Sequence, residues 1–280
     1  MKYCQFGSEH GRLVFYFHGT PGAPEECAMF DGYGKENDLM FICFDRFAIE
    51  SAIEGEAYYQ FLAKEILKKA DGAKVDIIGF SMGAFIALQT CRCLADNVRS
   101  LHLVSAAAPM DAGDFLDNMA GKQIFRLAQT FPSLFALLSY WQGLLALLCP
   151  KALFRMLFAN TAGEDKVLVL DRKFQSTLVE VLRSCFINRR QGYRREIKAY
   201  VQPWKTMLCE IFVNTHIWHG TEDNWSPKGM ADYLSSAIPG CTHTQILNGL
   251  SHYSCLHEAA PKICKLLADS SSIKKRGCTP

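Results

Sequence analysis

Three residues of the types that cooperate in nucleophilic catalysis, Ser81, Asp223 and His252, each follow a segment that we expect to be a buried strand. A serine hydroxyl is a weak nucleophile at neutral pH, and it reacts when a histidine takes its proton while an acid orients that histidine. In an open parallel sheet, ligands bind outside the carboxyl ends of the strands. We therefore expect the three side chains to converge at that edge.

Residues 79–83 read Gly-Phe-Ser-Met-Gly, and their flanks support a role for this short pattern. The apolar, β-branched run 74–78 predicts a buried strand, and residues 84–90 predict a helix. A sharp turn between strand and helix presents a serine at the top of a sheet, with strained dihedral angles that require small neighbours. The helix N-terminus also favours negative charge at this point. The pattern therefore predicts that Ser81 is a nucleophile.

Other acids and histidines compete for the remaining two roles. We favour Asp223 as the acid because the turn after a strand usually presents only one of two adjacent acids. We favour His252 as the base because it comes directly after the last expected strand. The competitors are Glu222, Asp111, His243 and His257.

A serine nucleophile also needs an oxyanion hole, in which two backbone N–H groups meet the developing negative charge. The residue after the nucleophile, Met82, would supply one of these groups. Thr20 would supply the other, because it lies in the turn-like run 18–22 directly after an expected strand. An ordinary turn is the alternative interpretation of that run.

Alternating strands and helices in two parts of the chain predict an α/β fold with a mostly parallel, doubly wound sheet. The alternation stops after Pro109, and residues 110–211 read as helical. We expect a core of residues 1–109 and 212–269, an inserted helical cap at 110–211 and a disordered tail at 270–280. The expected strands are 12–17, 39–44, 74–78, 98–104, 215–218 and 242–247.

These features together resemble the α/β-hydrolase superfamily, in its capped, single-domain form. The resemblance covers roughly residues 11–109 and 212–268, and it is specific for the superfamily but says little about the substrate. The matching stretches are Phe17–Gly22, Phe44–Arg46, Gly79–Gly83, His219–Asp223 and Ser251–His252.

The resemblance implies roles for five residues. Ser81 would be the nucleophile, Asp223 the acid and His252 the base, and the N–H groups of Thr20 and Met82 would form the oxyanion hole. No cofactor and no metal would be needed.

The chain departs from the superfamily in two places. It begins close to its first expected strand, so one or two of the usual eight strands would be missing. Phe47–Glu50 stands where relatives often have Pro-Gly-x-Gly. The second departure affects the expected shape of one pocket wall and leaves the catalytic chemistry unchanged.

Composition argues against a disordered chain, a nucleic-acid-binding protein and a secreted disulfide-rich protein. Hydrophobic residues make up 49% of the 280 residues and the net charge is +2, which argues against disorder and gives no general attraction to nucleic acid. The N-terminus lacks the apolar core of a signal peptide. The 12 cysteines include no C-x-x-C pair, so we expect reduced thiols in a cytoplasmic protein.

Substrate choice would depend on the expected cap. Residues 127–150 contain no charge, and we expect them to form helices that cover the site, with Phe135 and Trp141 as candidate substrate contacts. Pro132, Gln142 and Gly143 argue against a transmembrane span. A peripheral contact with lipid stays open as a secondary interpretation.

Charged groups in the expected cap leave two further alternatives open. The basic run 189–198 predicts a solvated helix face, or a site for an anionic group or a membrane surface. The acids Glu164, Asp165 and Glu180 could hold the free amine of an aminopeptidase substrate.

The sequence therefore predicts a serine hydrolase that forms an acyl-enzyme, with a small to medium, partly apolar carboxylic ester as the favoured substrate. An aminopeptidase resembling proline iminopeptidases and a carbon–carbon bond hydrolase are the alternatives among enzymes. A ligand receptor that keeps the fold without turnover is the alternative from another class. We expect a small-molecule substrate and either a monomer or a homodimer.

Overall fold

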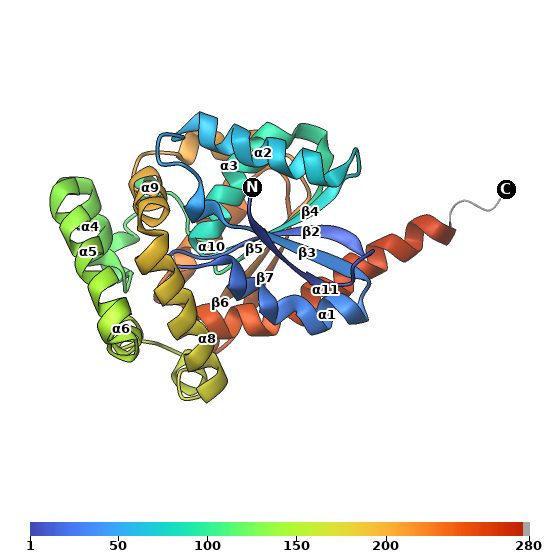
Figure 1. Ribbon diagram of the computed structural model, residues 1–280. Helices are drawn as coiled ribbons and strands as arrows, with labels where there is room; N and C mark the ends of the chain where they lie inside the picture. The colour runs from blue at the N-terminus through green and yellow to red at the C-terminus, as the bar shows by residue number, and fades with distance from the viewer. Residues whose placement is uncertain (277–280) are drawn as a thin grey trace.

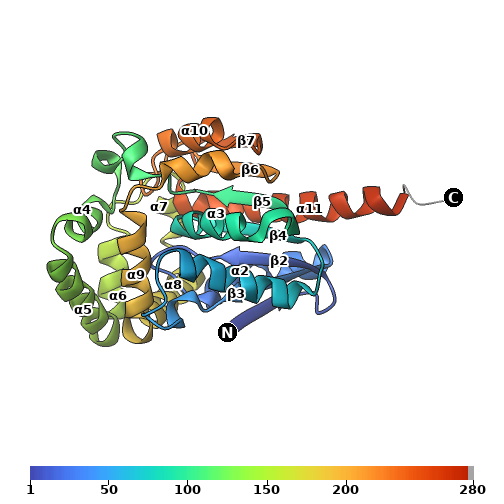
Figure 2. The same cartoon turned by 90° about the horizontal axis from the view of Figure 1, so that it is seen from above.

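A seven-stranded sheet forms the centre of the molecule in the computed structural model, which describes residues 1–276. The strand order is β1-β3-β2-β4-β5-β6-β7, and every neighbouring pair is parallel except β1 with β3. Figures 1 and 2 show the sheet between layers of helices. The strands are β1 (Tyr3–Gly7), β2 (Arg12–Phe17), β3 (Leu39–Phe44), β4 (Val75–Phe80), β5 (Val98–Val104), β6 (Thr215–Gly220) and β7 (Cys241–Leu247).

The central strands are mostly apolar because both faces of the sheet are covered, and the buried Asp76 in β4 pairs with Arg12 and Arg99. Every residue of β4 is buried. The helices α2 (Glu56–Ala70) and α3 (Met82–Leu94) lie on one face, and α1 (Asp31–Glu36) and α11 (His252–Arg276) lie on the other (Figure 1). The parallel fold class predicted from the sequence is therefore confirmed.

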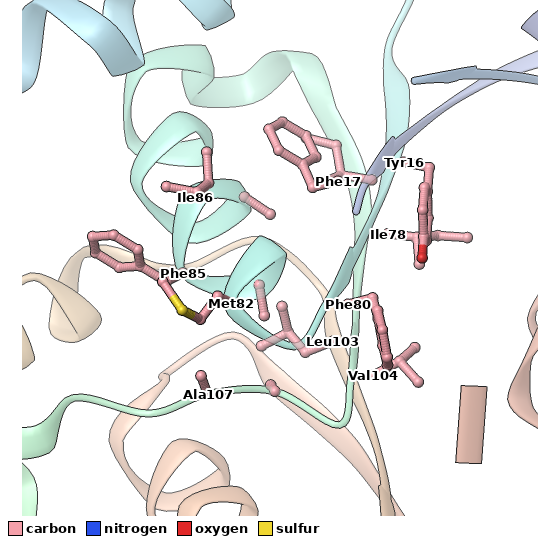
Figure 3. Close-up of a cluster of buried hydrophobic side chains, with 14 of the residues drawn as sticks. Tyr16, Phe17, Ile78, Phe80, Met82, Phe85, Ile86, Leu103, Val104 and Ala107 are labelled. Atoms are coloured by element: carbon pink, nitrogen blue, oxygen red, sulfur yellow. The ribbon is translucent and has the colours of Figure 1, made fainter. Parts of the chain in front are cut away.

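The apolar core extends to the turn between β4 and α3. Figure 3 shows Phe80 beside Val104 of β5 and, on the other side of the turn, Met82 beside Phe85 of α3, and these side chains are almost fully buried. Full burial of a side chain of this size contributes roughly 1.5–3 kcal/mol. The turn that carries Ser81 is consequently held by the core on both sides.

The chain between β5 and β6 is helical wherever it is regular. Figure 2 shows these helices beyond the carboxyl ends of the strands, with α5 farthest from the sheet. No helix within residues 1–276 is both long and apolar enough to cross a membrane. The α-helices of this segment are α4 (Lys122–Thr130), α5 (Pro132–Leu148), α6 (Pro150–Leu157), α7 (Asp165–Leu168), α8 (Arg172–Arg183) and α9 (Arg190–Tyr200).

Short 3-10 turns and one π-helical turn connect these elements, and α10 (Lys228–Ala237) joins β6 to β7. The π turn is Ser184–Asn188, and the 3-10 turns are Pro24–Phe30, Arg46–Ala48, Ala95–Asn97, Met110–Ala112, Leu116–Asn118 and Lys205–Glu210.

The N-terminal end of the chain agrees with expectation, since one of the usual eight strands is missing, whereas the C-terminal end differs in part. β1 is present and pairs antiparallel with β3, so the sheet has seven strands rather than the usual eight. The final helix continues to Arg276 and therefore includes residues 270–276 of the tail that we expected to be disordered. No proline or glycine interrupts the sequence there, and serine and lysine are compatible with a helix. The rest of that prediction, residues 277–280, lies outside the described part of the chain.

Candidate active site

Ser81 lies in the sharp turn between β4 and α3. Its φ angle is +56°, in the left-handed region that few non-glycine residues adopt. Its N–H donates to the carbonyl of Val104 at 3.0 Å, and its own carbonyl accepts from Ala84 at 3.0 Å. A Cβ at Gly83 would lie 2.1 Å from the Phe17 carbonyl oxygen, and one at Gly79 would lie 2.6 Å from the Ala84 Cα. Both positions therefore require glycine, because a side chain at either one would collide with the neighbouring backbone.

Asp223 and His252 form a buried pair. His252 Nδ1 lies 2.8 Å from Asp223 Oδ2 and 3.1 Å from Oδ1. Asp223 Oδ1 also accepts the backbone N–H groups of Trp225 and Ser226, each at 2.9 Å. Burial alone would raise the pKa of Asp223, but His252, His219 and the Ser226 N–H outweigh it and hold that pKa below its usual value. The carboxylate is thus kept ionised beside the imidazole.

His252 is the first residue of α11, and its ring is packed on two sides. The Trp225 ring lies nearly parallel to it at 5.8 Å, and the Phe80 ring lies at 4.8 Å. The Ser105 hydroxyl donates to the His252 carbonyl at 3.0 Å. These contacts fix both the ring and the backbone of His252.

Asp165, from α7, binds the N-terminus of the same helix. Its carboxylate accepts the N–H of Tyr253 at 3.0 Å and the N–H of Ser254 at 2.7 Å. These are two of the donors that a helix leaves unpaired at its start, so Asp165 acts as a cap supplied from a distant segment. Sequence reasoning considered Asp165 only as an amine-binding acid, because the partners lie 88 and 89 residues away.

Ser81 and His252 line the same small cavity of about 20 Å³, together with Gly19, Thr20 and Tyr253. Ser81 and Thr20 also line a neighbouring cavity of about 140 Å³, which we call the main cavity. Ser81 thus lines both cavities, His252 lines the smaller one, and Asp223 is buried and paired with His252.

The main cavity also contains both predicted oxyanion-hole residues, Thr20 and Met82, on its wall beside Ser81. Thr20 belongs to the loop after β2, and three buried side chains anchor this loop. Glu26 accepts the Gly19 N–H at 3.4 Å, and Arg46 donates to the His18 carbonyl at 3.0 Å. The third anchor, Glu196, accepts the Thr20 hydroxyl at 3.2 Å.

Glu196 lies at the centre of a buried ionic network that the sequence did not reveal. Its two oxygens accept Arg46 Nε at 3.0 Å and Nη2 at 3.1 Å, and the Tyr58 hydroxyl donates to Oε1 at 2.6 Å. Burial alone would lower the pKa of Arg46, but the Glu196 carboxylate outweighs it and raises that pKa. The network joins α9 directly to the loop that carries Thr20.

Two of the five basic side chains in the run 189–198, Arg189 and Arg195, bind groups of the core. Arg189 Nε lies 2.7 and 2.8 Å from the two oxygens of Asp45. Arg195 donates to the carbonyls of Arg46 and Ile49, at 2.7 and 3.2 Å. These two side chains attach α9 to the segment that follows β3, which neither interpretation had anticipated, whereas Lys198 is exposed, as on a solvated helix face.

Neither candidate substrate contact on α5 lies where we expected. Phe135 is fully buried behind Tyr193, with ring centroids 5.9 Å apart. Trp141 is 57% exposed on the outer face of the helix. The next residue, Gln142, lines the main cavity instead. Adjacent residues on a helix point about 100° apart, so Gln142 faces the cavity while Trp141 faces outward.

The wall of the main cavity is mostly apolar. Its polar side chains are neutral, and it contains no Asp or Glu. The residues contributed by the helical segment and its connections are Met119, Ala120, Gly121, Ile124, Phe125, Gln142, Met156, Leu157, Asn160, Phe186, Tyr193 and Ile197.

The competing residues lie elsewhere. Glu222 is exposed, and Asp111 pairs with Lys205 at 3.8 Å. Glu180 pairs with Arg183 at 3.2 Å on the outside of α8. His243 and His257 are both exposed, on β7 and α11.

Comparison with known proteins identifies what the chain is similar to. The model of a family described as the alpha/beta hydrolase family matches residues 18–264. The bromoperoxidase from Bacillus anthracis is 17% identical over 95% of this chain and 93% of its own, with a TM-score of 0.67. The esterase EaEST from Exiguobacterium antarcticum is 19% identical over 96% and 94%, with a TM-score of 0.64. A thermophilic esterase from Thermogutta terrifontis is 16% identical over 97% and 92%, with a TM-score of 0.64.

At these identities the structural likeness shows the fold alone. A sequence comparison with curated proteins finds no match.

Proposed function

Because the chain belongs to the alpha/beta hydrolase family, we propose that it is a serine hydrolase with Ser81, His252 and Asp223 as its catalytic triad. The observation that carries this proposal is the buried Asp223–His252 pair, at 2.8 Å, beside a serine in a strained turn. Each of these features is costly or unusual on its own, and their combination at one cavity matches the needs of nucleophilic catalysis.

The proposed reaction proceeds through an acyl-enzyme. Asp223 holds the Nδ1 proton of His252, which leaves Nε2 as the base that takes the Ser81 proton during attack on the substrate carbonyl. The N–H groups of Met82 and Thr20 stabilise the oxyanion. His252 then gives its proton to the departing group, and it later activates the water that releases the acid.

An ester is the favoured substrate because of the chemistry of the main cavity. A wall without carboxylates has nothing to pair with the ammonium group that an aminopeptidase must recognise. The volume of about 140 Å³ lies below the roughly 300–1,000 Å³ usual for ligand pockets, which favours a small acyl group in this conformation. The esterases among the structural neighbours are compatible with this assignment.

We assign the helical segment 110–211 as the cap of the enzyme and residues 1–109 and 212–269 as its core. The cap supplies much of the wall of the main cavity, including Gln142, and the core supplies the triad. Substrate selection would then be a property of the cap, and the chemistry a property of the core.

Labelling with a fluorophosphonate probe tests the proposal. Wild-type protein should label, and Ser81→Ala and His252→Ala should abolish labelling, whereas Ser254→Ala, which changes a nearby serine outside the triad, should still label. A panel of p-nitrophenyl esters and aminoacyl amides then separates an esterase from an aminopeptidase. Failure of folded wild-type protein to react with either the probe or a smaller organophosphate would favour a non-catalytic ligand receptor.

A further inference from the structure

The outer face of α5 is apolar and exposed. Its exposed positions follow a spacing of three and four residues, which places them along one side of the helix. They are Leu134 (51% exposed), Leu137 (56%), Trp141 (57%), Leu144 (43%) and Leu148 (67%), and we call this set the α5 face.

The exposed apolar surface continues beside this face. Phe131, Tyr140 and Leu147 are each more than half exposed, and the Arg190 guanidinium lies 3.8 Å from the centre of the Tyr140 ring. Figures 1 and 2 both show α5 at the outer end of the molecule, away from the sheet. Contiguous apolar surfaces of this kind mark sites of association.

The charge around the α5 face is mostly positive, although Asp117 pairs with one of the cations, Arg126. Residues 118–163 contain four basic side chains, Lys122, Arg126, Lys151 and Arg155, and no acidic one. Lys151 and Arg155 also line a groove of about 890 Å³ between α6 and α8. Arg172 adds a third cation to this groove, and Glu180, which pairs with Arg183, is its one acid among the described residues. An apolar face with a cationic border is complementary to an anionic, amphiphilic surface.

The main cavity reaches the exposed surface at α6, the helix that packs against α5. Met156 on α6 is 64% exposed and lines that cavity together with Ser81. Gln142 lies on the opposite side of α5 from the exposed set and lines the same cavity. We therefore expect a molecule that leaves a lipid surface beside α5 to enter the main cavity past Met156.

We infer that the α5 face docks on an anionic lipid surface and that the substrate is an ester dissolved in that surface. The part of this inference that concerns the substrate rests on the proposed hydrolase function. A second copy of the chain would bring the same cationic border against itself, which is unfavourable, whereas an anionic lipid surface neutralises it. The aromatic side chains Tyr140 and Trp141 are of the types enriched at membrane interfaces.

Co-sedimentation with vesicles tests the docking. The full chain should bind vesicles of equimolar phosphatidylcholine and phosphatidylglycerol and should bind phosphatidylcholine alone more weakly. The double variant Leu137→Ser/Trp141→Ser should lose on the order of tenfold or more in affinity. The variant Lys151→Glu/Arg155→Glu should lose the preference for anionic vesicles, with its affinity for them reduced roughly fivefold for each cation removed. High salt should weaken the binding of the wild type to the same vesicles.

Phe212→Ser is the matched control. Phe212 is 76% exposed, like the substituted residues of the α5 face, but it lies just before β6 and outside the helical segment 110–211. It should bind vesicles as the wild type does. All variants should hydrolyse a soluble short-chain ester within about twofold of wild type, since none of the substituted side chains lines the main cavity with Ser81.

Several outcomes would overturn the inference. If the wild type does not bind anionic vesicles, the docking inference is wrong. The hydrolase proposal still stands in that case if Ser81 reacts with the fluorophosphonate probe. Sedimentation velocity tests the other occupant. If the wild type is a dimer and the variant Leu137→Ser/Trp141→Ser is a monomer, the α5 face is an interface between two copies of the chain. Vesicle binding without serine labelling would keep the docking surface and remove the ester substrate.

Discussion

At the scale of single residues, the proposed triad depends most sharply on Asp223. Asp223→Asn preserves the shape of the side chain but favours the wrong tautomer of His252, so we expect kcat on a p-nitrophenyl ester to fall by about 10⁴. Glu222→Gln is the control, because Glu222 is adjacent but exposed, and it should retain near wild-type kcat. Similar kcat values for wild type and Asp223→Asn would remove Asp223 from the triad.

The lowered pKa of Asp223 also predicts how stability depends on pH. A carboxyl group whose pKa is lower in the folded state contributes stability above its unfolded pKa of about 3.9, and this contribution disappears as pH falls through the folded value. We expect the free energy of unfolding of the wild type to fall more steeply below about pH 4 than that of Asp223→Asn. Urea unfolding at a series of pH values measures the free energy of unfolding of both proteins. If this free energy depends on pH in the same way for wild type and Asp223→Asn, the prediction is wrong.

Gln142 offers a test of substrate recognition. Its side chain is 7% exposed, and its Oε1 has no hydrogen-bond partner within the described structure. Because an unpaired buried acceptor costs roughly 1–3 kcal/mol, Gln142→Leu should keep or raise the melting temperature. We expect it to hydrolyse alkyl esters as well as the wild type and to lose about tenfold in kcat/KM on esters with a hydroxyl in the acyl group. Equal losses on both ester classes would exclude a hydrogen bond from Gln142 to substrate.

The sequence predicted the nucleophile turn and the acid–histidine pair because each lies directly after a strand, where local pattern determines position. It did not predict Gln142 as part of the cavity wall, because the phase of α5 depends on which face packs inward. An apolar helix such as α5 has hydrophobic residues all around, so the pattern carries little information about that phase.

At the scale of elements, the position of His252 depends on the N-terminus of α11. Asp165→Ala removes the acceptor for two backbone N–H groups and should lower the free energy of unfolding by about 1–2 kcal/mol. It should also lower kcat more than it raises KM, because the displaced group is the base rather than a substrate contact.

Asp165→Asn, which retains one acceptor oxygen, should recover part of both losses, and Glu164→Ala should change neither, since Glu164 is exposed. Circular dichroism melts and steady-state kinetics measure the two effects. A loss of stability with unchanged kcat would restrict Asp165 to a purely structural role.

Element boundaries in the core were predictable because buried parallel strands are short apolar runs between turn signals. The contacts made by the helical segment were not, since Asp165 and Glu196 act on partners far away in the sequence. The basic run shows the same limit. Its composition indicated a charged surface, whereas Arg189 and Arg195 bind groups of the core.

At the scale of the whole molecule, the Arg46–Glu196 ion pair joins α9, in the proposed cap, to the loop after β2 that carries Thr20. Both side chains are almost fully buried, and Glu196 also accepts the Thr20 hydroxyl. Removing one partner of a buried ion pair leaves an uncompensated charge, so Glu196→Ala should cost about 3–5 kcal/mol of stability.

The double variant Arg46→Met/Glu196→Met separates the role of this pair in folding from its role in catalysis. Replacement of both charges by apolar side chains is often neutral or stabilising, so the double variant should unfold in urea near the wild-type midpoint. If the pair positions Thr20, its kcat should still fall, by about tenfold or more, because the loop has lost the Glu196 anchor. Wild-type kcat in a stable double variant would mean that the loop is held well enough by Glu26 and that the ion pair serves only to attach the cap.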